Sequence, residues 1–73
     1  MSIGTQIKKV THLPNGGTVT LAVEKKGLQV LGWRVVRHNN LNGSSVGRLT
    51  NELTADRLYA KYSNVPGAIE EVW

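Results

Sequence analysis

The residue types that most often carry out chemistry in proteins are few and scattered in this 73-residue chain. It contains no cysteine, which excludes a thiol nucleophile, a disulfide framework and a thiolate metal site. His12 and His38 are its two histidines, and neither lies in an HxxxH or HExxH metal motif. We therefore expect no metal and no cofactor, and we expect each histidine to be an ordinary residue at the end of a strand.

The acidic residues likewise form no recognisable catalytic set. A nucleophilic triad needs a serine or threonine, a histidine and a carboxylate that converge in space. Glu70 and Glu71 are expected in a helical turn, where adjacent side chains point in different directions and make a poor acid–base pair. The segment Gly43–Gly47 lacks both the lysine and the strand-to-helix setting of a phosphate-binding loop. The sequence therefore predicts a protein that is not an enzyme.

Positive charge is the chemical feature that stands out. Nine Lys and Arg against five Asp and Glu give a formal net charge of +4. A basic domain attracts polyanions through its overall field, although a solvated surface with an incidental bias explains the same count. Most of the basic residues fall in segments expected to form a sheet or its turns, and these are the candidate partner contacts: Lys8, Lys9, Lys25, Lys26, Arg34, Arg37 and Arg48.

Hydrophobic periodicity and turn residues predict the elements that position these side chains. Alternating apolar and β-branched residues, favoured in strands, predict four strands, at residues 3–13, 18–24, 28–38 and 44–50. Glycine and asparagine tolerate the positive φ of tight turns and separate these strands at Pro14–Gly17, Lys25–Gly27 and Asn39–Gly43.

The third of these strands is apolar on both faces, which is typical of a central strand. One face carries Leu31, Trp33 and Val35, and the other carries Leu28, Val30, Gly32, Arg34 and Val36. Either face could be the one that a helix covers. We favour the arrangement in which the helix covers the Trp33 face and Arg34 is exposed to a partner. In the reverse arrangement Trp33 would be exposed, and its ring could stack with the bases of a single strand.

Near residue 54 the spacing of the apolar residues changes from the alternation of a strand to the spacing of a helix, which predicts a helix. Thr54 is the expected N-cap of a helix over residues 55–63, with Leu53 and Leu58 as a hydrophobic staple and Asn64 as the C-terminal cap. The helix is expected to bury Ala55, Leu58, Tyr59 and Tyr62. Pro66 can open a further short turn, in which Ile69, Val72 and Trp73 need cover, with the Trp73 ring against the domain.

Together these elements predict a single domain over residues 1–73 with an α+β fold. We expect an antiparallel sheet of three to four strands with the C-terminal helix packed on one face. The other face would contact water or a partner. The chain shows no signal-peptide pattern and no apolar run long enough for a bilayer, so we expect a cytoplasmic protein with no membrane partner.

Part of this pattern resembles two families of DNA-binding domain. Gly32–Arg37, Asn42–Gly43, Val46–Leu49 and the Thr54-initiated helix are similar to the three-strand-plus-helix layout of integrase arm-binding and AP2-type domains. The resemblance covers residues 28–62, and the chain departs from it in its extra N-terminal hairpin and in lacking the Glu-Ala pattern of the helix. In those families the sheet face contacts DNA, so the resemblance implies DNA contacts for Arg34, Arg37 and Arg48.

Two hypotheses of function follow from the sequence. The first is a small non-enzymatic module that binds nucleic acid, DNA above all, through a basic open sheet face and basic turns. The second is a protein-interaction module, such as the small inhibitors and adaptors that phages and mobile elements often encode, which uses the sheet face or an edge strand. A homodimer joined through this face would fit the same sequence.

Overall fold

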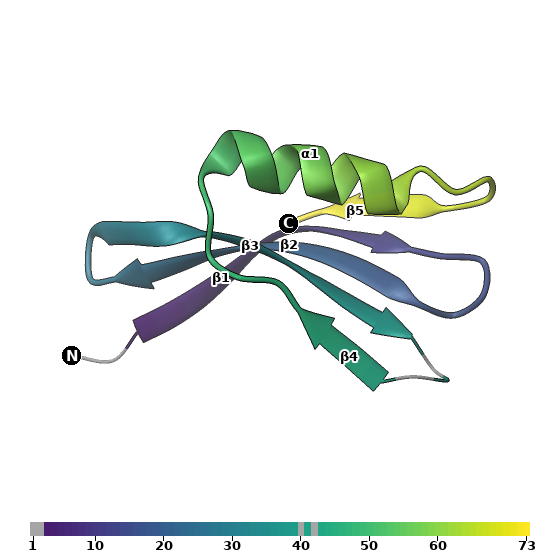
Figure 1. Ribbon diagram of the computed structural model, residues 1–73, viewed down its shortest axis with the longest axis horizontal. Helices are drawn as coiled ribbons and strands as arrows, with labels where there is room; N and C mark the ends of the chain where they lie inside the picture. Colours follow the sequence, from purple (N-terminus) through teal and green to yellow (C-terminus); the bar gives the residue numbers. More distant parts are fainter. Residues whose placement is uncertain (1–2, 40, 42) are drawn as a thin grey trace.

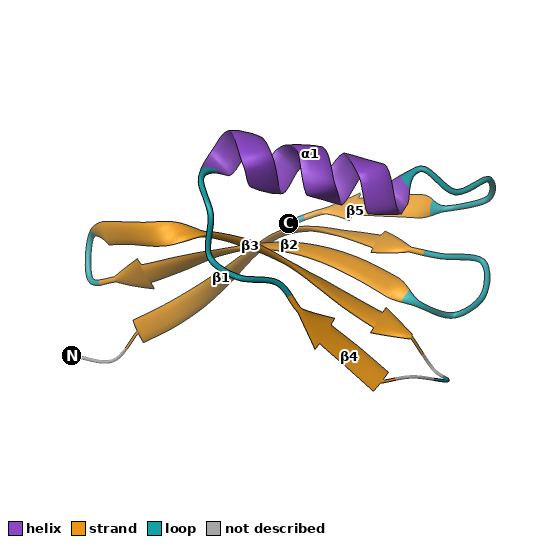
Figure 2. Ribbon diagram, viewed as in Figure 1, coloured by secondary structure: helices purple, strands orange, loops and turns teal. Residues whose placement is uncertain are grey.

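The computed structural model describes residues 3–39, 41 and 43–73 of the chain. They form an α+β fold, as expected, with one helix over one face of an antiparallel sheet (Figures 1 and 2). The elements in chain order are β1 (Ile3–His12), β2 (Thr18–Lys26), β3 (Gln29–Asn39), β4 (Gly43–Val46), α1 (Glu52–Ser63) and β5 (Ile69–Val72). The sheet has five strands in the order β4-β3-β2-β1-β5, one more than the upper limit of the prediction.

The two long hairpins show why the chain folds back where it does. In the first turn, the side-chain Oδ1 of Asn15 accepts a hydrogen bond from the Gly17 N–H at 2.9 Å, and Gly16 has a φ of 89°. The second turn lies later than predicted, because β2 continues through Lys26 and only Gly27 and Leu28 connect it to β3. Gly27 has a φ of 61°, and a glycine at this first central position suits a two-residue turn that matches the strand twist.

The helix covers the face of β3 that carries Trp33 and Val35, which is the arrangement we favoured. Val35 is opposite Leu21 in the register, and Trp33 is opposite Val23. The buried cluster between the sheet and α1 consists of Val19, Leu21, Val35, Ala55 and Tyr59, against which Leu13, Trp33, Leu58 and Tyr62 pack. Arg34 alternates with these residues and therefore lies on the face away from α1.

One expectation for this strand is wrong, because a β-bulge interrupts its alternation. Glu24 is opposite Gly32, but Lys25 is opposite Val30, so Leu31 is an extra residue on β3. Val30 therefore lies on the same side of the sheet as Lys25 rather than with Arg34. Leu31, which was expected beneath the helix, is exposed.

The helix begins three residues earlier than predicted. Asn51 is its N-cap, and the Asn51 Oδ1 accepts a hydrogen bond from the Thr54 N–H at 2.7 Å. Asparagine is at least as good an N-cap as threonine, so the earlier start costs nothing in capping. Leu53 then falls inside the first turn and is exposed, which leaves the predicted staple to Leu58 unformed. Asn64 is the C-cap, as predicted.

The predicted fourth strand is only half formed. β4 ends at Val46, and residues 47–50 run along β3 in an irregular course to α1. Gly47 donates its N–H to the Val35 carbonyl oxygen at 3.0 Å, and Thr50 exchanges two backbone hydrogen bonds with Trp33. A Cβ at Gly47 would lie 2.8 Å from that Val35 oxygen, so only glycine allows this close approach.

The residues after Pro66 form a strand instead of a helical turn. β5 pairs with the outer edge of β1, and the Trp73 N–H donates to the Lys8 carbonyl oxygen at 2.9 Å. Pairing satisfies backbone groups that β1 would otherwise leave free at the edge of the sheet. The expectation that Ile69, Val72 and Trp73 are covered is wrong, since they are 70%, 72% and 68% exposed.

A polar contact inside the core links α1 to the sheet. The hydroxyl oxygens of Tyr59 and Thr11 lie 2.6 Å apart, and both residues are 2% exposed. Burial raises the pKa of the Tyr59 hydroxyl; the Thr11 hydrogen bond acts in the opposite direction, and the Glu70 carboxylate raises it further. No helix in the described part of the chain is long and apolar enough to cross a membrane.

Candidate functional site

The sheet face opposite α1 carries less available positive charge than the sequence predicts. Arg34 lies on this face, but its Nε is 3.5 Å from Oε1 of Glu24 on the neighbouring strand. The same Glu24 oxygen accepts a hydrogen bond from the Thr5 hydroxyl at 3.0 Å. Because Arg34 is partly covered and its charge is opposed by a carboxylate, this face is a weak attractor of phosphates.

The four candidate lysines do not gather at one place. Lys8 is the extra residue of a bulge in β1, and the Lys9 ammonium lies 5.0 Å from the centre of the Tyr59 ring. Lys25 and Lys26 lie at the end of β2, beside the hairpin that projects to the left in Figure 1. The lysines are thus spread over separate parts of the sheet.

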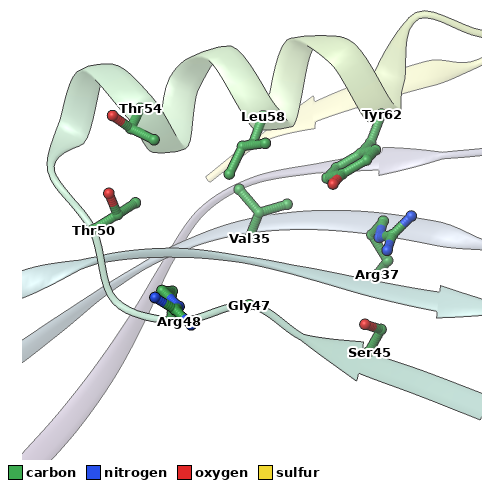
Figure 3. Close-up of a pocket in the computed structure, with 9 residues that line it drawn as sticks. All are labelled: Val35, Arg37, Ser45, Gly47, Arg48, Thr50, Thr54, Leu58 and Tyr62. Carbon is green, nitrogen blue, oxygen red and sulfur yellow. The ribbon is translucent and has the colours of Figure 1, made fainter.

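The structure brings Arg37 and Arg48 together on the side of the sheet that faces α1. There the helix, β3, β4 and residues 47–50 enclose a recess of about 220 Å³. Its lining residues are Val35, Arg37, Ser45, Gly47, Arg48, Thr50, Thr54, Leu58 and Tyr62. Figure 3 shows Leu58 and Tyr62 reaching down from the helix towards Val35 and Arg37 on the sheet.

A second recess of about 320 Å³ continues the first towards the β3–β4 connection. The two recesses share the lining residues Arg37, Ser45 and Tyr62, so they lie directly beside each other. The second recess extends to Leu13 at the start of the β1–β2 turn and to His38 on β3. We call the combined depression the α1–β4 groove.

Two arginines line the α1–β4 groove, and further cations lie on the helix beside it. The Arg37 guanidinium carbon lies 4.2 Å from the centre of the Tyr62 ring, which is a cation–π contact. The Lys61 ammonium lies 6.0 Å from the same centre. Arg57 precedes Lys61 by four residues and therefore lies on the same side of α1.

The acidic side chains of the helix lie away from this groove. With 3.6 residues per turn, Asp56 lies about 160° around α1 from the groove residue Leu58. Glu52 precedes Asp56 by four residues and shares its side of the helix. Neither Asp nor Glu occurs among the described residues that line the two recesses. The positive charge of the groove is therefore not offset by a lining carboxylate.

Sequence reasoning identified the two arginines of this groove but not the groove itself. It assigned Leu58 and Tyr62 to the buried face of the helix, and the candidate contacts that it named include no cation of the helix. One signal was available, because Arg37 follows Val35 by two residues and so shares its helix-facing side. No pattern in the sequence indicated that α1 and residues 47–50 would form the other sides of the groove.

Each histidine contacts a side chain on a neighbouring strand. His38 Nδ1 lies 2.9 Å from the Ser44 hydroxyl, and this contact joins β3 to β4. His12 Nε2 lies 3.7 Å from a Glu71 carboxylate oxygen at the β1–β5 edge, where both side chains are exposed. Within residues 3–39, 41 and 43–73, no cluster of three or more His, Cys, Asp or Glu could hold a metal ion.

Comparison with known proteins adds no relative: no family model, curated protein or solved structure matches the chain. The resemblance to integrase arm-binding and AP2-type domains therefore stays a prediction from sequence. The chemistry of the groove follows from its own residues, which combine arginine and lysine donors with an apolar floor. Such a surface can bind an anionic group and cover an apolar one at the same time.

Proposed function

We propose that this protein is a small non-enzymatic module that binds nucleic acid through the α1–β4 groove. The proposal keeps the partner expected from the sequence and moves the contact surface from the open sheet face to the helix side. The observation that carries it is that Arg37 and Arg48 line a depression whose described lining residues include no carboxylate, with the Lys61 ammonium 6.0 Å from the ring centre of the lining residue Tyr62.

Phosphate binding is what this set of side chains does best. Guanidinium groups donate planar, bidentate hydrogen bonds to phosphate oxygens, and stacking on an aromatic ring holds the group in place. Arg37 is stacked in this way on Tyr62. The Ser45, Thr50 and Thr54 hydroxyl groups that line the groove add neutral donors.

The test is a salt-dependent binding measurement by fluorescence anisotropy, with labelled DNA of about 20 nucleotides in single-stranded and duplex form. Neutralising about four phosphates of a single strand gives a slope of log affinity against log salt of about −3. Affinity would then fall about 50-fold between roughly 50 and 200 mM salt. Arg48→Gln should weaken binding and lessen the slope by about 0.7.

The matched controls remove the same charge elsewhere. Lys26→Gln, at the far hairpin, and Arg34→Gln, on the open face, should leave the salt slope within error of the unaltered protein. If Arg34→Gln weakens binding and Arg48→Gln does not, the open face is the interface and the groove assignment is wrong. If neither form of DNA binds at about 50 mM salt, the proposed function fails.

A second candidate function, recognition of a protein strand, is favoured by the exposed edge at β5. β5 is the last strand of the sheet, and Ile69, Val72 and Trp73 lie uncovered along it. Glu70 and Glu71 make antiparallel pairing with a second copy of β5 unfavourable. If the helix-covered faces of the two sheets lie on the same side, such pairing places glutamates of the two copies directly opposite each other, and like charges in this position repel. An extended partner segment that carries lysine or arginine fits this edge better.

This candidate is tested with the peptide Thr-Lys-Val-Lys-Thr-Lys and its glutamate counterpart Thr-Glu-Val-Glu-Thr-Glu. The lysine peptide should shift Trp73 fluorescence and the backbone amide resonances of β5, and the glutamate peptide should shift neither. Trp73→Phe should remove the fluorescence signal while the amide shifts remain. Dimerisation of the free protein in size-exclusion chromatography would instead identify a second copy as the occupant of the edge.

A further inference from the structure

The α1–β4 groove differs from a flat basic surface because its charge surrounds an apolar floor. Val35 is 5% exposed at the bottom of the groove, and Leu58 and Tyr62 pack beside it from the helix (Figure 3). A duplex offers phosphates and base edges to a protein, whereas a single strand also offers the flat faces of its bases. The apolar floor can cover a base face and has no counterpart on a duplex surface.

The size of the groove also favours a single strand over a duplex. Its two recesses, of about 220 and 320 Å³, approach or reach the lower end of the range for pockets that hold small ligands, roughly 300–1,000 Å³. The recesses adjoin each other at the stacked pair of Arg37 and Tyr62, so consecutive units of a bound chain can occupy one recess and then the other. A flexible single strand can place successive nucleotides along such a path, while a rigid duplex can only lie across its rim.

The distribution of cations fits a strand that passes along the groove. Arg48 lies on the 47–50 segment, Arg37 lies on the floor against Tyr62, and Arg57 and Lys61 lie on the helix. Two cations therefore belong to the lining of the groove, and the helix cations lie outside the lining on the other side of the apolar residues. This order matches a nucleotide whose base turns inward and whose phosphates stay at the rim.

We infer that the α1–β4 groove selects single-stranded nucleic acid, with a base against the Val35, Leu58 and Tyr62 floor and the flanking phosphates on Arg37, Arg48 and the α1 cations. This inference rests on the proposed function, since it names the form of nucleic acid that the same groove takes. Recognition of base faces rather than base edges implies weak sequence preference.

The experiment compares four labelled or competing polyanions of matched length: single-stranded oligothymidine, the corresponding duplex, an abasic deoxyribose-phosphate strand and polyglutamate. At equal salt, oligothymidine should bind at least about tenfold more tightly than the abasic strand, which has the same charge but no base to stack. The duplex and polyglutamate should bind more weakly than oligothymidine.

Two protein variants separate the base contact from the phosphate contacts. Tyr62→Leu keeps apolar bulk and removes the ring, so it should lower oligothymidine affinity about tenfold. Because Arg37 loses the ring that holds its guanidinium, the abasic strand should also bind more weakly, but by a clearly smaller factor, and the salt slope should be preserved. Arg48→Gln should weaken both strands equally. As a measurement without mutation, the methyl resonances of Val35 and Leu58 should shift upfield with oligothymidine and not with the abasic strand.

The outcomes distinguish the inference from the function on which it rests. A duplex that binds as tightly as the single strand, or an abasic strand that binds as tightly as oligothymidine, overturns the inference and leaves nucleic-acid binding standing. Absence of binding to every nucleic acid overturns both. Polyglutamate that binds as well as oligothymidine identifies an acidic protein segment as the ligand and also overturns both.

Discussion

Substitution of the buried Tyr59–Thr11 pair tests whether the core is assembled as described. The two hydroxyl groups are 2.6 Å apart and join α1 to β1 through a contact that both residues bury almost completely. Tyr59→Phe keeps the ring and creates no cavity, so its cost comes from polar groups alone. It removes one hydrogen bond and leaves the Thr11 hydroxyl buried without that partner.

The expected loss of unfolding free energy can be worked from these two effects. The hydrogen bond contributes about 1 kcal/mol net, and leaving a hydroxyl buried without its partner adds about 1 kcal/mol or more, which gives about 2 kcal/mol for Tyr59→Phe. A domain of this length has roughly 4–11 kcal/mol of stability in total. A loss of about 2 kcal/mol lowers the Tm by about 8–16 °C.

The assay is urea denaturation of the two single variants and the double variant. Thr11→Val should cost about 1–2 kcal/mol, because the Tyr59 hydroxyl then loses its partner. The double variant removes both hydroxyls, so it should cost less than the sum of the single variants, with a coupling of about 1–2 kcal/mol.

Tyr62→Phe is the matched control, because in the described part of the chain no hydrogen bond to its hydroxyl is found. It should change the unfolding free energy by less than about 0.5 kcal/mol. If the effects of the Tyr59 and Thr11 substitutions simply add, within about 0.3–0.5 kcal/mol, the two side chains are not paired and the helix is not seated on β1 as described.

Three further predictions concern the supports of the fold. Asn51→Ala removes the side-chain acceptor of the first turn of α1 and should cost about 1 kcal/mol in urea denaturation; an unchanged midpoint would contradict the cap. Gly47→Ala places a methyl 2.8 Å from a β3 carbonyl oxygen and should cost about 1–3 kcal/mol, whereas Gly4→Ala, with open space around its Cβ, should cost far less; equal losses would refute the steric argument. Because burial raises the pKa of Tyr59 above its usual value of 10.0, the unfolded state loses this proton first, and the free energy of unfolding should fall as pH rises above about 10. Tyr59→Phe should reduce this loss of unfolding free energy at alkaline pH. If the unaltered protein and the Tyr59→Phe variant have identical pH profiles, the Tyr59 hydroxyl is not the cause of the loss.

Local pattern was sufficient to predict most of the elements. Alternation over residues 18–24 and 28–38 predicted β2 and β3. Because residues 28–38 are apolar on both faces, either face could lie beneath the helix, and the packing of α1 against Val35 and Trp33 decided between them. The helix was predicted from its periodicity, but its start was misplaced because Asn51 and Thr54 are both good N-caps and only the backbone conformation distinguishes them.

The errors occurred where a short segment depends on a distant neighbour. β5 has four residues, two of them glutamate, and nothing within it favours a strand until the free edge of β1 is beside it. The bulge at Leu31 likewise arises from the pairing of β3 with β2, and one extra residue was enough to place Val30 on the other side of the sheet.

By itself, the sequence determined the α+β class and the excess of positive charge, and it left two candidate helix-facing sides for the third strand. These properties follow from the order of residue types along a few consecutive positions. Only the tertiary structure decided which face of the third strand α1 covers and which basic side chains share a recess. Glu24 opposes Arg34 from the neighbouring strand, and Arg37 and Arg48 line one recess beneath α1. Such an arrangement depends on how separate segments pack, since side chains that share a recess can lie far apart in sequence.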